Sequence, residues 1–216
     1  MISLLAMTLA AVSVFQPAGA PGDATPPRPL VFNEIQRKFA AAPAMQIDRN
    51  QTYLATFETT KGRIVVELYA KDAPITVNNF VFLAKAGYFD GLNFHRYVPG
   101  FVVQGGDPDG NGTGGPGYTI KDEFGPLGRK HVQGAVGMAR TQAPNSSGSQ
   151  FYFCLDAAPH LDGGYTVFGQ VTEGLDVVLN LRRGDVMTKV TIATPAPATQ
   201  PSTQPAADAP TAPSGN

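Results

Sequence analysis

The chain has 216 residues, a net charge of −1 and a single cysteine, Cys154. This length accommodates one domain with a full core plus tails. Because basic residues are not clustered, the chain lacks the charge pattern of a nucleic-acid-binding protein. A single cysteine excludes an intramolecular disulfide, so stability must come from packing, and we interpret Cys154 as a buried, inert thiol.

Residues 1–20 are typical of a signal peptide. Residues 2–15 are apolar and Ala18-Gly19-Ala20 has the small-residue pattern of a cleavage site, although no Lys or Arg precedes the run. The run is short for a spanning helix, and no second stretch is long enough to span a membrane. We expect export to the periplasm or exterior, with membrane tethering only if the signal stays uncleaved. The alternative is a buried or disordered amino-terminal segment.

Low-complexity segments flank the expected domain. Residues 21–50 are interpreted as a linker, rich in Pro, Gly and Ala at its start. Within it, apolar residues with helical spacing precede Pro43 and predict a short helix over 31–42: Phe32, Ile35 and Phe39. Residues 193–216 contain mainly Pro, Thr, Ala, Gln and Ser without an apolar period, which predicts a disordered tail.

The globular domain is expected over residues 51–192. Apolar alternation and turn signals predict eight strands: 53–59, 64–68, 93–98, 101–104, 134–140, 149–155, 166–171 and 189–192. One helix is expected to have Asp72 as N-cap, Pro74 in its first turn and Gly87 after its end, and a second is expected over 175–182. This pattern indicates an antiparallel sheet closed into a barrel, with helices over its open ends.

Two motifs in the glycine-rich loop are rejected. Residues 110–115 match the spaced glycines of a dinucleotide site, but Pro116-Gly117 follows where a helix should begin. Residues 107–112 imitate the start of a calcium loop, but Tyr118 stands where the bidentate Glu belongs, so only a weak ion site remains open. The histidines lack metal-ligand spacing and no serine lies in a Gly-x-Ser-x-Gly motif. No metal or other cofactor is predicted.

Arg96 is a lone charge in the apolar, aromatic strand over 93–98. Strand alternation places Arg96 on the face of Phe94 and away from His95, which we interpret as structural. A guanidinium beside apolar side chains and the amide of Gln104, which we expect to be withdrawn from water, could grip a partly apolar group and polarise one of its atoms. The alternative is an edge-strand charge that reaches water along its apolar stem.

Ordered motifs over residues 52–192 are shared with one family: Phe94-His95-Arg96, Pro99-Gly100-Phe101, Gln104-Gly105-Gly106-Asp107, Asn111-Gly112-Thr113-Gly114-Gly115, Met138-Ala139-Arg140, Asn145, Gly148-Ser149-Gln150-Phe151, Leu161-Asp162-Gly163 and Val167-Phe168-Gly169. Together they resemble the cyclophilin family of peptidyl-prolyl isomerases. The resemblance implies a mainly β fold, a closed eight-stranded antiparallel β-barrel capped by two α-helices.

The resemblance also implies roles for individual residues. Arg96 would be the catalytic residue, and Gln104 would position both the substrate and Arg96. The residues lining the proline pocket would be Phe101, Val102, Tyr152, Leu161 and Tyr165. The residues bordering the groove for flanking substrate residues would be Gly112, Ala139, Arg140 and His160.

Three of these positions depart from the commonest animal pattern of the family. Val102 replaces a methionine and Tyr152 a phenylalanine, which changes the volume and polarity of the pocket. A buried tyrosine hydroxyl needs a partner, or it lowers the affinity for an apolar ring. His160 replaces a tryptophan whose indole donor the family uses to hold cyclosporin, so we expect only weak cyclosporin binding.

The expected function is cis-trans isomerisation of X-Pro bonds in unfolded or flexible protein segments, which assists folding. Rotation breaks no covalent bond, so it requires no nucleophile, metal or acid-base pair. The alternative is a proline-peptide-binding chaperone or scaffold with little catalysis. We expect a monomer whose partners are X-Pro peptides and unfolded proteins, with neither a nucleic acid nor a membrane span after signal removal.

Overall fold

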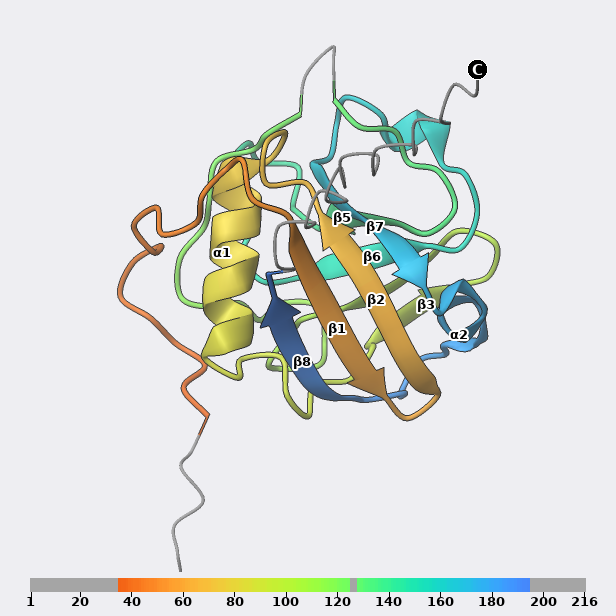
Figure 1. Cartoon of the computed structure of the whole chain (residues 1–216). Helices are drawn as coiled ribbons and strands as arrows, with labels where there is room; N and C mark the ends of the chain where they lie inside the picture. Colours follow the sequence, from red (N-terminus) through yellow and green to blue (C-terminus); the bar gives the residue numbers. More distant parts are fainter. Residues whose placement is uncertain (1–34, 125–127, 195–216) are drawn as a thin grey trace, which may run out of the picture. The chain divides into compact units, whose positions relative to one another are not determined.

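The computed structural model describes residues 35–124 and 128–194; the expected signal peptide, part of the linker and nearly all of the tail lie outside these residues. The described chain forms eight strands, two α-helices and one 3-10 helix (Figure 1). In chain order these are β1 (Tyr53–Thr59), β2 (Gly62–Leu68), α1 (Pro74–Lys85), β3 (Arg96–Val98), β4 (Val102–Gly105), β5 (Ala135–Met138), β6 (Phe151–Cys154), η1 (Pro159–Leu161), β7 (Val167–Glu173), α2 (Leu175–Asn180) and β8 (Met187–Ala193).

All strands belong to one curled antiparallel sheet with the order β3-β4-β6-β5-β7-β2-β1-β8. The edge strands β3 and β8 do not pair with each other. Instead, the residues just before β3 bond to the first residue of β8 and to the residues ahead of it: Gly91 N donates to Met187 O at 2.7 Å, and Phe94 N to Asp185 O at 2.9 Å. The expected eight-stranded antiparallel fold is confirmed, but its edges are joined by an isolated antiparallel bridge between Asn93 and Val186, and not by pairing of β3 with β8.

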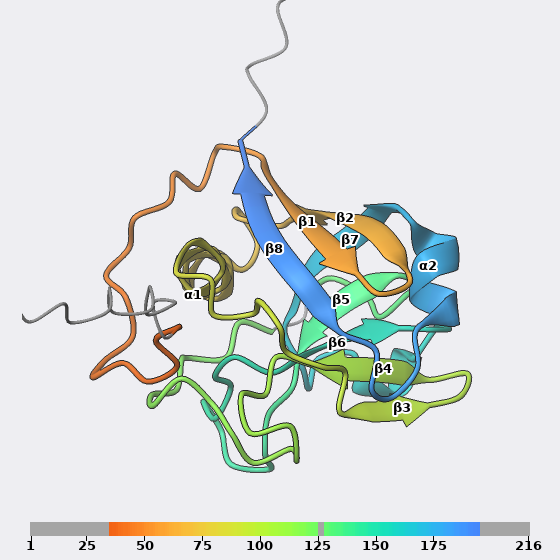
Figure 2. The same cartoon turned by 90° about the horizontal axis from the view of Figure 1, so that it is seen from below.

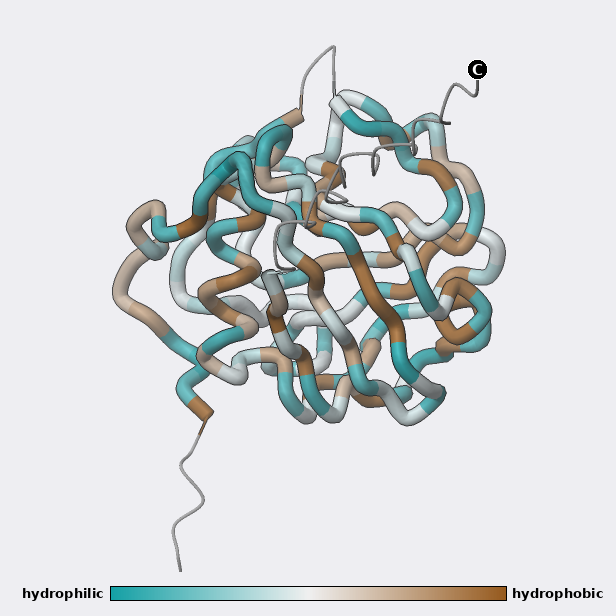
Figure 3. Tube along the Cα trace, in the orientation of Figure 1, coloured by the Kyte–Doolittle hydropathy of each residue, from teal (hydrophilic) through white to brown (hydrophobic). Residues whose placement is uncertain are grey.

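The two helices pack on different parts of the sheet. Helix α1 contacts β8 and helix α2 contacts β2, and Figures 1 and 2 place them on opposite sides of the strands. The apolar face of α1 enters the core, where the Phe80 ring stacks on Phe89 at 4.9 Å and lies 5.7 Å from Phe151. Figure 3 shows apolar residues along the strands and on α1, whereas many connecting turns are hydrophilic.

Helix α1 does not begin with the side-chain cap that its sequence predicts. Ala73 is the N-cap, and the exposed Asp72 accepts instead from Arg129 Nε at 2.8 Å. The carboxylate of Glu123 accepts from Ile75 N at 2.9 Å and from Thr76 N at 2.8 Å. These N–H groups have no partner within the helix, so a distant carboxylate satisfies them and also offsets the positive end of the helix dipole. Gly87, at φ 70°, follows the helix as expected.

The helix expected over 31–42 is absent from its described part, residues 35–42, which are irregular. This stretch belongs to a longer segment, residues 35–50, which we call the strap. The Phe39 ring packs against Phe82 at 5.0 Å, and Phe39 N donates to Pro116 O at 2.8 Å. The apolar spacing therefore reflects tertiary contacts, and these residues pack on the domain where the sequence predicts a linker.

The alternation of the strands creates a second apolar cluster on the outer face of the sheet. In β4, Val103 faces the main core while Val102 faces outward, and in β6 the Phe151 ring faces inward while Tyr152 faces outward. The outward cluster comprises Val102, Ala135, Tyr152, Cys154 and Val167, with Tyr69, Phe101, Ala139, Leu161 and Tyr165 packed on it. This cluster forms the base of the candidate site.

Candidate active site

A hollow of about 180 Å³ opens on the outer face of β3, β4 and β6. Nine side chains line it: Arg96, Phe101, Val102, Gln104, Ala139, Arg140, Tyr152, Leu161 and Tyr165. Its floor is the second apolar cluster, and its rim carries the guanidinium and amide groups. Apolar walls with a few directed polar groups are typical of a small-molecule or peptide site.

All of the residues to which the family resemblance assigns a role line this hollow, with two exceptions. The exceptions are Gly112 and His160. Gly112 lines a neighbouring groove of about 440 Å³. His160 is exposed on η1, with its ring 5.2 Å from that of Phe101, so it flanks the hollow without lining it.

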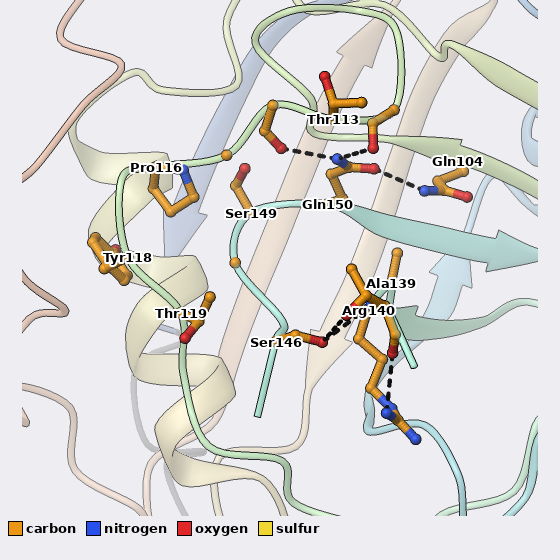
Figure 4. A pocket seen from close by; sticks show the side chains of 15 residues that line it. Gln104, Thr113, Pro116, Tyr118, Thr119, Ala139, Arg140, Ser146, Ser149 and Gln150 are labelled. Atoms are coloured by element: carbon orange, nitrogen blue, oxygen red, sulfur yellow. Dashed lines mark hydrogen bonds between the residues drawn. The ribbon is translucent and has the colours of Figure 1, made fainter. Parts of the chain in front are cut away.

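Strand pairing explains why Arg96 and Gln104 meet. They are directly opposite residues of β3 and β4, and Arg96 Nη1 donates to Gln104 Oε1 at 3.2 Å. Gln104 Nε2 then donates to Gln150 Oε1 at 2.9 Å, and Gln150 Nε2 donates to Gly114 O at 2.8 Å. This chain of amides fixes which Gln104 atom faces Arg96. Figure 4 shows its part from Gln104 through Gln150 to the glycine-rich loop.

Two expectations about Arg96 need correction. Phe94 does not share its face, because the regular strand begins only at Arg96 and the Phe94 ring is fully buried in the main core. The guanidinium was also expected to be withdrawn from water, but Arg96 is exposed at the rim. The hollow therefore lies beside Arg96 without covering it.

The neighbouring groove shares Gln104, Ala139 and Arg140 with the hollow, so the two adjoin. Figure 4 shows Ala139 and Arg140 across this groove from Thr113 and Pro116, with Gln150 and Gln104 bonded at one end. The Arg140 side chain is held by a hydrogen bond, in which its Nε donates to Gly164 O at 2.9 Å. An extended peptide with its proline in the hollow would have room for its neighbouring residues here.

Tyr152 forms the floor of the hollow and its hydroxyl has a partner. Tyr152 Oη lies 2.9 Å from Nε2 of His131, whose Nδ1 lies 2.9 Å from Asp162 Oδ1. Sequence reasoning missed His131 and Asp162 as neighbours of the site, because no local pattern connects three residues from separate segments. Gln150 was noted only as part of a motif, although its amide bonds to Gln104.

His95 directly precedes Arg96 in the sequence and is 9% exposed. Burial lowers its pKa below the ordinary value, with the nearby Asp107 acting in the opposite direction, so the ring is neutral at neutral pH. Neither ring nitrogen has a hydrogen-bond partner within the described residues. Those residues also contain no group of three His, Cys, Asp or Glu side chains placed to hold a metal ion.

The chain is similar to proteins of one family throughout this region. The profile of the family described as cyclophilin type peptidyl-prolyl cis-trans isomerase/CLD matches residues 54–199. A peptidyl-prolyl cis-trans isomerase of Helicobacter pylori is 50% identical over 142 residues, which are 65% of this chain and 86% of the relative. Peptidyl-prolyl cis-trans isomerase B of Bacillus subtilis is 51% identical over 131 residues, 61% of this chain and 91% of the relative.

Solved structures are similar as well. A Cryptosporidium parvum cyclophilin type peptidyl-prolyl cis-trans isomerase has a TM-score of 0.62 and 28% identity, and the match covers 67% of this chain and 99% of that one. A second structure of it, in the presence of the dipeptide Ala-Pro, has a TM-score of 0.60, 30% identity and coverage of 65% and 98%. No helix among the described residues is long and apolar enough to cross a membrane. The chain belongs to the cyclophilin-type peptidyl-prolyl cis-trans isomerases, and its activity is the cis-trans isomerisation of X-Pro bonds.

Proposed function

We propose that Arg96 is the catalytic residue and that the hollow beside it binds the substrate's prolyl ring. The proposal rests on one observation: a guanidinium, oriented by Gln104, stands at the rim of a small apolar hollow that opens into a groove. The structure of a relative in the presence of the dipeptide Ala-Pro supports an X-Pro segment as the ligand of this site.

The chemistry needs only a modest reduction of the barrier. Uncatalysed X-Pro rotation has a barrier of about 18–20 kcal/mol, because the amide is stabilised by resonance. A turnover of about 10–1000 per second corresponds to a barrier of about 13–16 kcal/mol, so the site must supply about 3–6 kcal/mol. A hydrogen bond from Arg96 to the prolyl nitrogen would favour the twisted, pyramidal nitrogen of the transition state. By analogy with oxyanion-hole donors, it would contribute about 2.7–4 kcal/mol.

The rest of the reduction in the rotation barrier would come from anchoring the prolyl ring in the hollow. Phe101, Val102 and Leu161 hold the ring while the acyl side turns, and binding in the hollow fixes the geometry in which rotation occurs. Because Arg96 is exposed, the bound peptide itself must cover the guanidinium and exclude water from the new hydrogen bond. Gln104 contributes by holding the guanidinium at the rim through its bond to Nη1.

Substrates are proposed to be unfolded or flexible segments of exported proteins, whose slow X-Pro steps limit folding. Export is supported only by the apolar start and small-residue site of residues 2–20. We also propose that the protein is a monomer. Cyclosporin should bind weakly, because His160 stands exposed beside Phe101 where the family pattern has an indole donor. Titration calorimetry should give a dissociation constant far above the low nanomolar range, and a low nanomolar constant would refute this point.

A peptide-binding role with little catalysis was the alternative, because Tyr152 would add an unsatisfied hydroxyl to the pocket. That hydroxyl is bonded to His131, so the objection to a prolyl ring in the hollow no longer holds. No other feature of the site favours the binding module over the enzyme.

The deciding experiment is an NMR exchange or protease-coupled assay on an Ala-Pro peptide with the wild type, Arg96→Ala and Arg63→Ala. Arg63 is an exposed strand arginine paired with Glu173 and absent from the hollow, so it serves as the control. We expect Arg96→Ala to lower kcat by about 100- to 1000-fold and Arg63→Ala to retain wild-type turnover. Equal turnover in all three proteins would refute the role of Arg96.

A further inference from the structure

A hydrogen-bonded chain of three side chains runs beneath the proline hollow: Tyr152 and His131 are buried, and Asp162 at its far end is partly exposed. Tyr152, in β6, is 4% exposed, and His131 is 2% exposed. The distance between Tyr152 Oη and His131 Nε2 is 2.9 Å. The other ring nitrogen of His131 lies 2.9 Å from Asp162 Oδ1, which also accepts from the backbone N–H of His131 at 2.9 Å. The rings of His131 and Tyr152 are nearly parallel, with 17° between their planes. Position 131 is therefore held by both its backbone and its side chain.

The proton positions in this chain follow from its ends. The two N–H groups of His131 hold the pKa of the Asp162 carboxyl below its ordinary value, so this group is a carboxylate and can only accept. Nδ1 of His131 must therefore carry a proton. Burial lowers the pKa of His131, so the ring is neutral and Nε2 offers a lone pair. Consequently, the Tyr152 hydroxyl donates its proton to His131 and away from the prolyl ring.

The hydrogen-bonded side chains of Tyr152, His131 and Asp162 also connect two walls of the hollow. Tyr152 forms its floor, while Asp162 directly follows Leu161, the η1 residue that lines its side. The lining residue Tyr165 contacts the Tyr152 ring edge-on at 6.3 Å. His131 bridges the floor and this segment without reaching the hollow itself. A change at His131 would thus alter the orientation of the floor and the spacing of the two walls together.

We propose that His131 is a positioning residue of the isomerase: it holds the Tyr152 ring and the Leu161 wall in place and keeps the tyrosine hydroxyl directed away from the prolyl ring. The proposal deepens the proposed binding of proline in the hollow and rests on it. It goes beyond the Arg96 hypothesis, because it concerns affinity for the ring and not the donor that lowers the barrier.

A double-mutant cycle tests the proposal. His131→Phe keeps a ring of similar size but cannot accept the hydroxyl proton, so the floor retains an orphaned O–H. We expect KM for an Ala-Pro peptide to rise about three- to tenfold, with kcat little changed, because ground and transition states lose the same contact. Adding Tyr152→Phe removes the orphaned group and should return KM to the value of Tyr152→Phe alone. A histidine that only stabilises the fold would not be rescued in this way.

Acid pH provides an independent readout. A proton on Nε2 would make both ring nitrogens donors, and the Tyr152 hydroxyl would lose its acceptor. Because burial lowers the pKa of His131, the wild-type KM should rise only once the pH lies below the ordinary histidine value of about 6.5, whereas KM of Tyr152→Phe should not. Other titratable or charged groups face this chain: Lys130 and His160 near His131, and Arg140, Cys154 and Tyr165 near Tyr152. Tyr152→Phe retains all five, so the comparison isolates the hydroxyl.

The tautomer can be read directly on the wild type, even if a variant fails to fold. Imidazole ¹⁵N chemical shifts at pH 7.5 should identify His131 as protonated at Nδ1 and unprotonated at Nε2. The opposite tautomer would overturn the proposal, as would an unchanged KM in folded His131→Phe or the absence of rescue by Tyr152→Phe. Loss of turnover in Arg96→Ala tests the proposed catalytic residue separately, so the two failures can be distinguished.

Discussion

The Tyr152 ring lies against Gly137 of the neighbouring strand, and a Cβ atom at position 137 would lie 2.5 Å from both Cζ and Oη of the tyrosine. The two residues face each other across the pairing of β5 and β6. A methyl group cannot occupy that position while the ring stays where it is. The glycine therefore gives the tyrosine its place on the outer face of the sheet, within reach of His131.

Gly137→Ala should displace the Tyr152 ring toward the hollow and break its bond to His131. Because the hollow is only about 180 Å³, we expect KM for an Ala-Pro peptide to rise at least fivefold, with a smaller change in kcat. Steady-state kinetics on the folded variant would check this. In a Tyr152→Ala background the same substitution should have little further effect, and an equal effect there would contradict the steric explanation.

The pH profile of turnover should be nearly flat from about pH 6.5 to 9. An arginine keeps its charge over this range, and the mechanism uses no proton transfer. The measurement is kcat at saturating Ala-Pro peptide across the range, by NMR exchange so that no coupling protease intervenes. A bell-shaped kcat profile within this window would point to a titrating group in the chemical step and against the Arg96 mechanism.

The strap should contribute to stability although it precedes β1. Phe39→Ala removes a half-buried ring from Phe82 and Tyr88, and we expect it to lower the free energy of unfolding by about 1–2 kcal/mol. Urea denaturation followed by circular dichroism would measure this loss. Ile35, which is 40% exposed, provides the matched control, because its replacement by Ala should change stability by less than about 0.5 kcal/mol.

Glu123, and not Asp72, should determine the stability of the first turn of α1. Glu123→Ala leaves two helix N–H groups and the Thr76 hydroxyl without the carboxylate. The expected loss is about 1–2 kcal/mol, similar to that of a deleted N-cap. Asp72→Ala removes only an exposed ion pair with Arg129, and its effect should stay below about 1 kcal/mol. Equal losses in the two variants would show that the assignment of the cap is wrong.

Stability should decrease as pH falls below about 6.5, the ordinary histidine value. Burial lowers the pKa of both His95 and His131 in the folded chain. The unfolded chain therefore binds these protons first as pH falls, which favours unfolding, while above this range the contribution is fully present. Melting temperatures between pH 5 and 8 should fall less steeply in His95→Gln than in the wild type. His160→Gln, at an exposed position, should match the wild type.

Most of the fold could be predicted from the sequence, because its elements depend on local periodicity. The strand over 53–59 matches its observed bounds, and the helix ends before Gly87, because these signals are contained in a few neighbouring residues. The strap could not be predicted in this way. The spacing of Ile35 and Phe39 fits a helix, but the Phe39 ring is placed by Phe82 and Tyr88, which are more than forty residues away.

The site shows the same division. The motifs brought Arg96, Gln104 and the lining residues together correctly as neighbours, since strand pairing and family resemblance both place them. The partner of the Tyr152 hydroxyl could not be found, because His131 lies 21 residues away in sequence and no periodic pattern includes it. The exposure of Arg96 could not be predicted either, because alternation tells which face a residue occupies but not how deeply that face is covered.

The pairing of β1 with β8 joins residue 54 to residue 193. Nearly the whole domain must therefore leave the ribosome before its first strand gains one of its two neighbours. The residues that lead into β8 also hold the backbone just ahead of Arg96. A nascent chain that stops short of them lacks the bonds that hold the backbone just ahead of Arg96. We expect isomerase activity to emerge late and abruptly during synthesis, only once the final strand has docked.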